Sequence, residues 1–214
     1  LNAIYAYKSI DSDPYEIASL ACNIEINKCG EPIGKQDQFA ASFGGLRMYE
    51  FMPDESVNIH DIKCTDSFKN QLNNSSISFY LGTTRSASNI LEVQKEVSKK
   101  LNKKLVLRRM AQIAHEFKCG IENSSIDNLV DLMNENWSLK KSLTSHISNT
   151  FVDDVYKTGL DAGAWAGKLL GAGGGGFVTF LAPKRAHKRI KEKLSNLRKV
   201  SLKMEDHGSQ IIHK

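Results

Sequence analysis

A glycine-rich loop between two apolar segments, "GKLLGAGGGGFVTF", is the feature that most constrains how this chain folds. Glycine loses more backbone entropy on folding than any other residue, so the four consecutive glycines from Gly173 to Gly176 are costly. The apolar residues on either side predict two strands joined by the loop. Two interpretations stay open from the loop alone. It is either a tight, strained hairpin or a backbone that approaches a ligand closely, with its N–H groups turned toward an anion.

The rest of the chain carries both helix and strand signals, which predict a mixed α+β fold. Asp13, Pro14 and Glu16 form a helix-start pattern like a capping box, and that helix ends near Gly30. Periodicity and turn residues predict the remaining elements. They are a helix at the start of the chain, a short helix near Asp37, strands at 44–51, 57–63 and 76–82, helices at 83–101, 104–118, from 125 and 148–161, a basic helix at 184–198, and final strands at 198–205 and 209–213.

Composition excludes several classes of function. Apolar residues make up 41% of the 214-residue chain and the net charge is only +5, which is typical of a globular protein with a real core. The lysine-rich stretches at 99–104 and 184–194 lack interleaved aromatic residues, so we expect solvated faces there and no nucleic-acid partner. No apolar run reaches the roughly 20 residues that cross a membrane. The four cysteines show no metal-ligand spacing, and we expect a cytoplasmic protein with free thiols.

Three side chains have both a chemical and a purely structural interpretation when each is taken alone. Asp37 lies between Gln36 and Gln38, where it could act as a general base or cap the following helix. Glu25, on the face of the preceding helix, could bind a metal ion or simply face solvent. Arg85, directly after a predicted strand, suits a phosphate but also suits an exposed surface.

Three stretches together resemble one family: "GEPIGKQDQFAASFGGL", "YLGTTRSAS" and "GKLLGAGGGGFVTF". They resemble the GHMP small-molecule kinases, and within them the D-glycero-D-manno-heptose 7-phosphate kinases, with the L-fucokinases as near neighbours. "KLLGAGGGGF" is similar to the third signature of that family. "GKQDQ" is similar to the segment that holds the catalytic aspartate in the sugar-kinase branch. The resemblance covers essentially the whole chain.

The resemblance implies roles for the residues around Asp37. Asp37 falls on the catalytic aspartate, which accepts or orients the proton of the sugar hydroxyl that attacks the γ-phosphate of ATP. Glu25 resembles the helix glutamate that binds Mg²⁺ in several of these kinases, and a carboxylate suits this hard cation. Gln36 and Gln38 are candidates for binding the sugar hydroxyls.

The resemblance also implies where phosphate groups bind. The glycine loop lies beside the substrate and the nucleotide phosphates in the family, which would explain its costly glycines. Lys168 and Arg85 are candidates for the phosphate of the sugar. The loop glycines assigned to this role are Gly171, Gly173, Gly174, Gly175 and Gly176.

The resemblance implies an α+β fold of two lobes. Residues 1–83 would be the partial amino-terminal lobe, of the ribosomal-S5 domain-2-like type, and residues 84–214 the ferredoxin-like carboxy-terminal lobe. The ATP-phosphate loop of the family precedes a helix similar to "LNAIYAYK", with which this chain starts. We therefore expect the natural protein to extend upstream, and these 214 residues alone not to turn over ATP.

The expected activity is transfer of the γ-phosphoryl group of ATP, with Mg²⁺, to the anomeric hydroxyl of D-glycero-D-manno-heptose 7-phosphate, in nucleotide-activated heptose synthesis. Two alternatives stay open. One is a kinase of L-fucose, a galactose-like sugar or a mevalonate-like compound, and the other is a non-catalytic GHMP-like binding protein. The expected partners are ATP and a sugar phosphate, with no membrane. The oligomeric state stays open, a homo-oligomer included.

Overall fold

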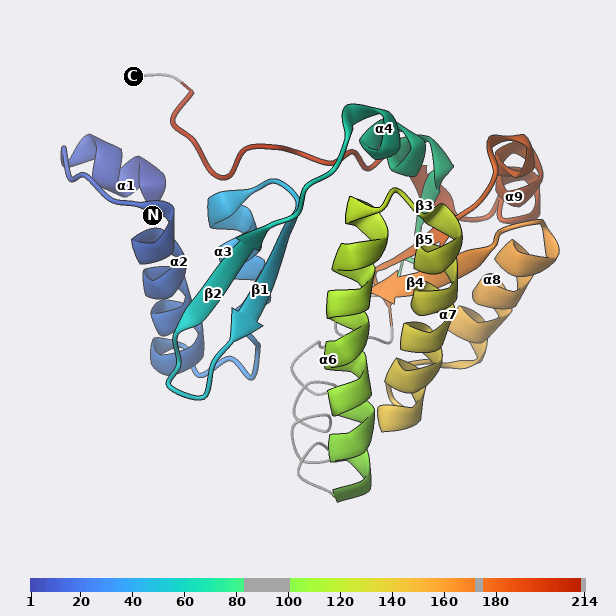
Figure 1. Cartoon of the computed structure of the whole chain (residues 1–214), viewed down its shortest axis with the longest axis horizontal. Coiled ribbons are helices and arrows are strands. Elements are labelled where there is room, and N and C mark those ends of the chain that lie inside the picture. The colour runs from blue at the N-terminus through green and yellow to red at the C-terminus, as the bar shows by residue number, and fades with distance from the viewer. Residues whose placement is uncertain (83–100, 172–174, 213–214) are drawn as a thin grey trace. The chain divides into compact units, whose positions relative to one another are not determined.

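The computed structural model describes residues 1–82, 101–171 and 175–212 (Figure 1). The chain forms two compact units, of which the first comprises Leu1–Ile62 and Met204–Lys214 and the second comprises Lys63–Lys203. Both units combine helices with strands, which confirms the α+β class predicted from the sequence. The lobe boundary between residues 83 and 84 stays a prediction, and the compact units divide the chain elsewhere.

The first unit consists of helices followed by a hairpin. In chain order its elements are α1 (Asn2–Tyr7), α2 (Pro14–Cys22), the π-helix η1 (Asn23–Lys28), α3 (Gln36–Phe43), β1 (Arg47–Phe51) and β2 (Val57–Asp61). The two strands are antiparallel, with Tyr49 opposite Ile59. The start of α2 confirms the predicted capping box, because the Asp13 carboxylate accepts a hydrogen bond from the Glu16 N–H at 2.8 Å.

Phe39 lies at the centre of the apolar core of the first unit. Its side chain is buried, and its ring meets the edges of Tyr15 and Tyr49 at centroid distances of 5.3 and 6.2 Å. Ala18 of α2 and Val57 of β2 belong to the same buried cluster. Edge-to-face ring pairs add about 0.5–1.5 kcal/mol each beyond the area that they bury. This cluster therefore fixes α3, which carries Asp37, against both α2 and the hairpin.

The last part of the chain returns to the first unit. The Gly45 N–H donates to the Glu205 carbonyl and the Ser209 N–H donates to the Ala41 carbonyl, both at 2.9 Å. These bonds hold residues 204–209 along the end of α3. Residues 209–212 pair with no strand of the described chain, so the strand predicted at 209–213 is wrong over these residues.

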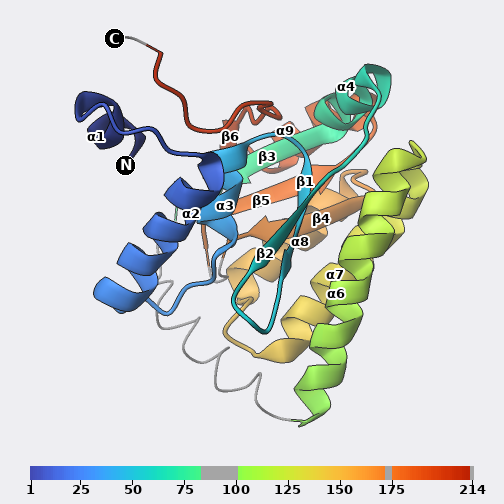
Figure 2. The ribbon, with the colours of Figure 1, turned by 60° about the vertical axis from the view of Figure 1, so that its left-hand side comes forward.

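The second unit contains a four-stranded antiparallel sheet in the order β4-β5-β3-β6 (Figure 2). Its elements are α4 (Asp66–Ser75), β3 (Ser76–Tyr80), α6 (Leu101–Glu122), α7 (Ile126–Leu143), α8 (Thr150–Asp161), β4 (Ala166–Leu170), β5 (Phe177–Leu181), the 3-10 helix η2 (Lys184–Ala186), α9 (His187–Lys193) and β6 (Arg198–Val200). The chain order of strand, helices, two strands, helix and strand is the ferredoxin-like arrangement expected of the carboxy-terminal lobe. Figure 1 shows α6 and α7 side by side.

One face of this sheet forms the core of the second unit. Side chains alternate between the two faces of a strand, and Phe79, Leu169 and Val178 are fully buried in one in-register row. The helices complete this core, for example with Trp137 of α7. The row beside it carries polar side chains, and that row includes Lys168.

Several element bounds differ from the sequence prediction. The helix α4 was not predicted, because only Phe68 and Leu72 give it an apolar face among polar residues. The strand predicted at 198–205 is limited to β6, and the helix predicted at 104–118 is part of the longer α6. The helix predicted at 83–101 falls almost wholly outside the described residues. Among the described helices, none has both the length and the apolar content needed to cross a bilayer.

Candidate active site

The helix that carries Glu25 changes from α-helical to π-helical hydrogen bonding at Asn23, shortly before this residue. Within η1 the Cys29 N–H donates to the Ile24 carbonyl, five residues back, at 2.9 Å. Such π-helical turns are rare and are frequent at functional sites. The turn ends near Gly30, which has a positive φ of 73° and lets the chain reverse toward α3.

Asp37 is not the cap of α3. The helix begins at Gln36 and its N-cap residue is Lys35, which makes no side-chain cap bond. Lys35 instead forms an ion pair with Glu55 in the turn between β1 and β2. Asp37 is the second residue of the helix, where the helix dipole favours a negative charge. The capping interpretation of Asp37 is therefore wrong, and its exposed carboxylate interacts with the helix end only through the dipole.

Gln38 joins α3 to the π-helical segment. Its Nε2 donates to the Glu25 Oε2 at 2.6 Å, although the two residues are 13 positions apart. The Gln38 side chain is only 8% exposed, and its buried Oε1 has no hydrogen-bond partner among the described residues. A buried acceptor left without a donor costs about 1–3 kcal/mol. The bond to Glu25 fixes the orientation of the Gln38 amide.

Glu25, Asp37 and Gln38 line one cavity of the first unit, with a volume of about 720 Å³. Ser42 and Ser209 add two hydroxyl groups to its wall, and the other lining residues are mostly apolar. Ligand sites usually combine an apolar wall with a few polar groups in this way. The structure thus brings together three of the predicted site residues. In the first unit as described, the exposed Gln36 lies outside the lining of this cavity.

The two carboxylates of this cavity suit a magnesium ion that also binds substrate phosphates. Mg²⁺ in such sites is held by one or two carboxylates, with water and phosphate oxygens as its other ligands. Glu25 uses Oε2 for Gln38 and keeps Oε1 available. Among the described residues, no group of three or more acidic, histidine or cysteine side chains could hold a metal ion by itself. Water and phosphate oxygens would therefore have to complete the coordination of Mg²⁺ here.

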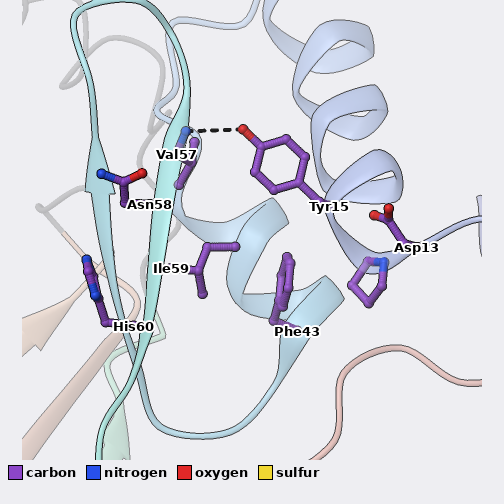
Figure 3. Close-up of a pocket in the computed structure, with 8 residues that line it drawn as sticks. Asp13, Tyr15, Phe43, Val57, Asn58, Ile59 and His60 are labelled. Carbon is purple, nitrogen blue, oxygen red and sulfur yellow. Dashed lines mark hydrogen bonds between the residues drawn. The ribbon is translucent and has the colours of Figure 1, made fainter.

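A second hollow of the first unit, of about 540 Å³, lies between the start of α2, the end of α3 and the strand β2 (Figure 3). Phe43 and Ile59 give it an apolar wall, and the Tyr15 hydroxyl accepts a hydrogen bond from the Val57 N–H at 3.1 Å. None of the predicted site residues lines it, so the sequence motifs point to the first cavity.

In the second unit, lysine side chains gather at the start of the glycine loop. Gly171 and Gly176 have positive φ values of 89° and 91°, as expected for glycines that let the backbone turn sharply. The Lys140 Nζ, from α7, donates to the Gly171 carbonyl at 2.7 Å. The Lys168 Nζ, from β4, donates to the Asn136 Oδ1 at 2.8 Å. Nothing in the sequence distinguishes Lys140, because "SLKKS" is typical of an ordinary exposed helix face.

Both lysines are perturbed by their surroundings. Burial, with a smaller contribution from the charge of Lys168, lowers the pKa of Lys140 to about 8. Burial also lowers the pKa of Lys168. Desolvation of this kind disfavours an ammonium group. Arg85, Gly173 and Gly174 lie outside the described residues, so their predicted roles stay predictions.

Comparison with known protein families gives a match over the second unit. Residues 100–199 match the family described as GHMP kinases C terminal. Over 192 residues the chain is 29% identical to the D-glycero-alpha-D-manno-heptose 7-phosphate kinase of Campylobacter jejuni, and the match covers 89% of this chain and 57% of that protein.

Solved structures with the same fold include two kinases. A D-glycero-D-manno-heptose 1-phosphate kinase from Bacteroides thetaiotaomicron superposes with a TM-score of 0.71 at 23% identity, over 100% of this chain and 60% of that one. The Streptococcus pneumoniae phosphomevalonate kinase, solved with phosphomevalonate and AMPPNP, gives a TM-score of 0.75 at 14% identity, over 95% of this chain and 64% of that one. The chain thus spans about three fifths of the length of these relatives.

Proposed function

We propose that the chain belongs to the GHMP kinases, whose carboxy-terminal family matches residues 100–199, and that the protein containing it is an ATP-dependent sugar kinase. Its proposed acceptor is D-glycero-D-manno-heptose 7-phosphate, phosphorylated on the anomeric hydroxyl in nucleotide-activated heptose synthesis. The observation that carries the proposal is the convergence of Glu25, Asp37 and Gln38 on one cavity. The identity to the heptose 7-phosphate kinase of Campylobacter jejuni supports the choice of sugar.

Asp37 is the proposed base for the attacking hydroxyl. Phosphoryl transfer passes through a loose transition state, so positioning and charge neutralisation supply most of the catalysis. One carboxylate within hydrogen-bond reach of the sugar hydroxyl is then sufficient to accept or orient its proton. Asp37 is exposed to the cavity and is not required as a helix cap, so its carboxylate is available for this task.

Gln38 and Glu25 have complementary proposed roles in the same cavity. Gln38 lines the cavity, and its proposed role is to bind a sugar hydroxyl. Glu25 is the proposed magnesium ligand, with Asp37 as the second carboxylate of the cavity. Bound Mg²⁺ would neutralise charge on the phosphates of ATP. Because the Gln38 amide donates to Glu25, the sugar and metal positions are linked by one hydrogen bond.

The test is an assay of ATP consumption by the full-length protein as its gene encodes it. The acceptors compared are D-glycero-D-manno-heptose 7-phosphate, L-fucose, galactose and mevalonate. We expect turnover with the heptose phosphate, a loss of about 10²- to 10⁴-fold in Asp37→Asn, and no loss in the control Asp54→Asn. Asp54 is a carboxylate of the same unit that accepts a hydrogen bond from the Ser56 hydroxyl at 2.6 Å, away from the cavity.

Each outcome of this assay decides between the open alternatives. Turnover of another acceptor that depends on Asp37 keeps the chemistry and changes the substrate. Turnover that survives in Asp37→Asn refutes the proposed base. An absence of ATP turnover with every acceptor refutes the kinase activity and favours a non-catalytic binding protein.

A further inference from the structure

Lys140 and Lys168 are two neighbouring ammonium groups without a counter-charge. Each donates to a neutral oxygen, Lys140 to the Gly171 carbonyl and Lys168 to the Asn136 side chain. Within the described ranges 101–171 and 175–212, neither forms an ion pair with a carboxylate. Lys141, the next residue along α7, does form one with Asp153, at 3.3 Å. The uncompensated charge is therefore a property of this pair of lysines and not of the whole helix.

An anion would relieve the cost of placing these two charges together. Burial disfavours each ammonium group, and the repulsion between the two charges adds to the cost for Lys140. A lysine ammonium has three donors, and each of these two uses one of them, so four N–H groups remain for a ligand. A phosphate dianion offers both the opposite charge and enough acceptor oxygens, and lysine binds phosphate as a point charge.

The position of the pair also suits a phosphorylated ligand. Lys140 donates to the first glycine of the loop, so its ammonium group lies where β4 ends. In the sheet register Lys168 is opposite Thr179, whose hydroxyl is hydrogen-bonded to that of Ser78 at 2.7 Å. A polar row made of Lys168, Thr179 and Ser78 thus crosses three strands, on the face of the sheet opposite the neighbouring buried apolar row.

We propose that Lys140 and Lys168 together form the binding site for a terminal phosphate group of a substrate. Two sources share this chemistry, the phosphate of the sugar and the phosphates of the nucleotide. The choice between these ligands rests on the proposed kinase function, whereas the existence of the site does not. The site adds Lys140 to Lys168, which the sequence suggested together with Arg85 for the phosphate of the sugar.

A purely structural role for Lys140 makes a different prediction. If Lys140 only holds the Gly171 carbonyl, a glutamine at this position keeps a donor for it and ligand binding is unchanged. If its charge binds phosphate, Lys140→Gln loses binding and Lys140→Arg keeps it. The adjacent Lys141→Gln removes one charge from the same helix and is the matched control.

The first experiment uses the wild-type full-length protein with ¹³C-dimethylated lysines, observed by NMR during pH titrations with and without inorganic phosphate. We expect phosphate to raise the pKa of Lys140 and to shift the signals of both lysines, and to leave Lys141 unchanged. A pKa of Lys140 that does not respond to saturating phosphate, or a response equal to that of Lys141, overturns the proposal. This measurement needs no variant and no turnover.

The second experiment measures binding of heptose 7-phosphate and of ADP to the variants by calorimetry. We expect Lys140→Gln and Lys168→Gln each to weaken one of these ligands by about 10-fold or more, whereas Lys141→Gln does not. Loss confined to the heptose phosphate assigns the site to the sugar, and loss confined to ADP assigns it to the nucleotide. Unchanged affinity for both ligands overturns the site.

The two proposals fail separately. A protein without kinase turnover whose Lys140 still responds to phosphate lacks the proposed function and keeps the site. A protein that turns over heptose 7-phosphate equally well with and without the two lysines keeps the function and lacks the site.

Discussion

Gly44 follows the end of α3, and we expect a single methyl group added there to disturb the structure of the candidate active site most. Its backbone has φ 60° and ψ −167°, a conformation that is essentially restricted to glycine. A Cβ added at Gly44 would lie 2.1 Å from the carbonyl carbon of His207. The atom in the way belongs to the backbone, so the Gly44→Ala variant must displace the segment around His207.

The cost of Gly44→Ala has two parts. The backbone strain of a non-glycine residue in this region is about 1–3 kcal/mol. Displacing the segment also breaks the hydrogen bonds that tie it to the end of α3, from Gly45 to Glu205 and from Ser209 to Ala41. Each such bond contributes about 0.5–1.5 kcal/mol net. We therefore expect Gly44→Ala to lower the free energy of unfolding by about 2–6 kcal/mol.

Alanine variants of two further glycines measure the backbone strain and the displacement of the segment separately. Gly30 has a φ of 73° and no atom within 4 Å of an added Cβ, so Gly30→Ala carries the backbone strain alone, about 1–2 kcal/mol. Gly208 has no positive φ, but its added Cβ would lie 1.9 Å from the Ser42 carbonyl oxygen, so Gly208→Ala carries the displacement alone, about 1–3 kcal/mol.

The assay is urea unfolding of the full-length protein, followed by circular dichroism, together with limited proteolysis of residues 204–214. We expect the loss of stability to rank Gly44→Ala above both other variants, and the clash variants Gly44→Ala and Gly208→Ala to expose the segment to protease. Because Ser209 lines the cavity with Asp37, these two variants should also weaken substrate binding. Equal losses in Gly44→Ala and Gly30→Ala, with the segment still protected, would refute the close backbone contact.

Three further predictions concern packing, a strand bond and pH. Gly159→Ala should cost about 1–3 kcal/mol in thermal unfolding, because the added Cβ would lie 2.4 Å from the buried Phe180 ring. Tyr15→Phe should cost about 1 kcal/mol in urea unfolding, since it removes the acceptor of the Val57 N–H. Burial lowers the pKa of Lys140 from 10.5 to about 8, so the unfolded chain binds more protons across that window. The free energy of unfolding should accordingly rise between about pH 8 and 10.5 by an increment that Lys140→Gln lacks; an identical pH dependence in that variant would contradict this.

Elements with local signals were predictable from the sequence. The capping box of Asp13 and Glu16 forms as predicted, because both partners lie within one helical turn. The hairpin of β1 and β2 and the two strands around the glycine loop also agree, since alternation and turn residues specify them locally. The convergence of Asp37 and Glu25 on one cavity was implied only by the family resemblance.

Features that depend on distant partners were not predictable in this way. The strand β3 pairs with β5 and β6, about a hundred residues later, and no local pattern around β3 indicates these partners. Residues 209–212 pair with no strand of the described chain, and Ser209 bonds to the Ala41 carbonyl of α3 instead. Only its bond to the Gly171 carbonyl distinguishes Lys140 from Lys141, which forms an ion pair with Asp153. No sequence pattern around the two lysines separates them.

The π-helical segment explains how Glu25 reaches Gln38 while the neighbouring Asp37 is left for its proposed role. An unbroken α-helix would bond the Cys29 N–H four residues back, to Glu25, whereas here it bonds to Ile24 and the Glu25 carbonyl accepts from the Glu31 N–H at 3.0 Å. The wider turn changes the direction in which Glu25 leaves the helix and brings it to Gln38. Gln38 is thereby held as the buried partner of Glu25. Its neighbour Asp37 takes another direction from α3, into the same cavity, because successive residues of a helix point in different directions.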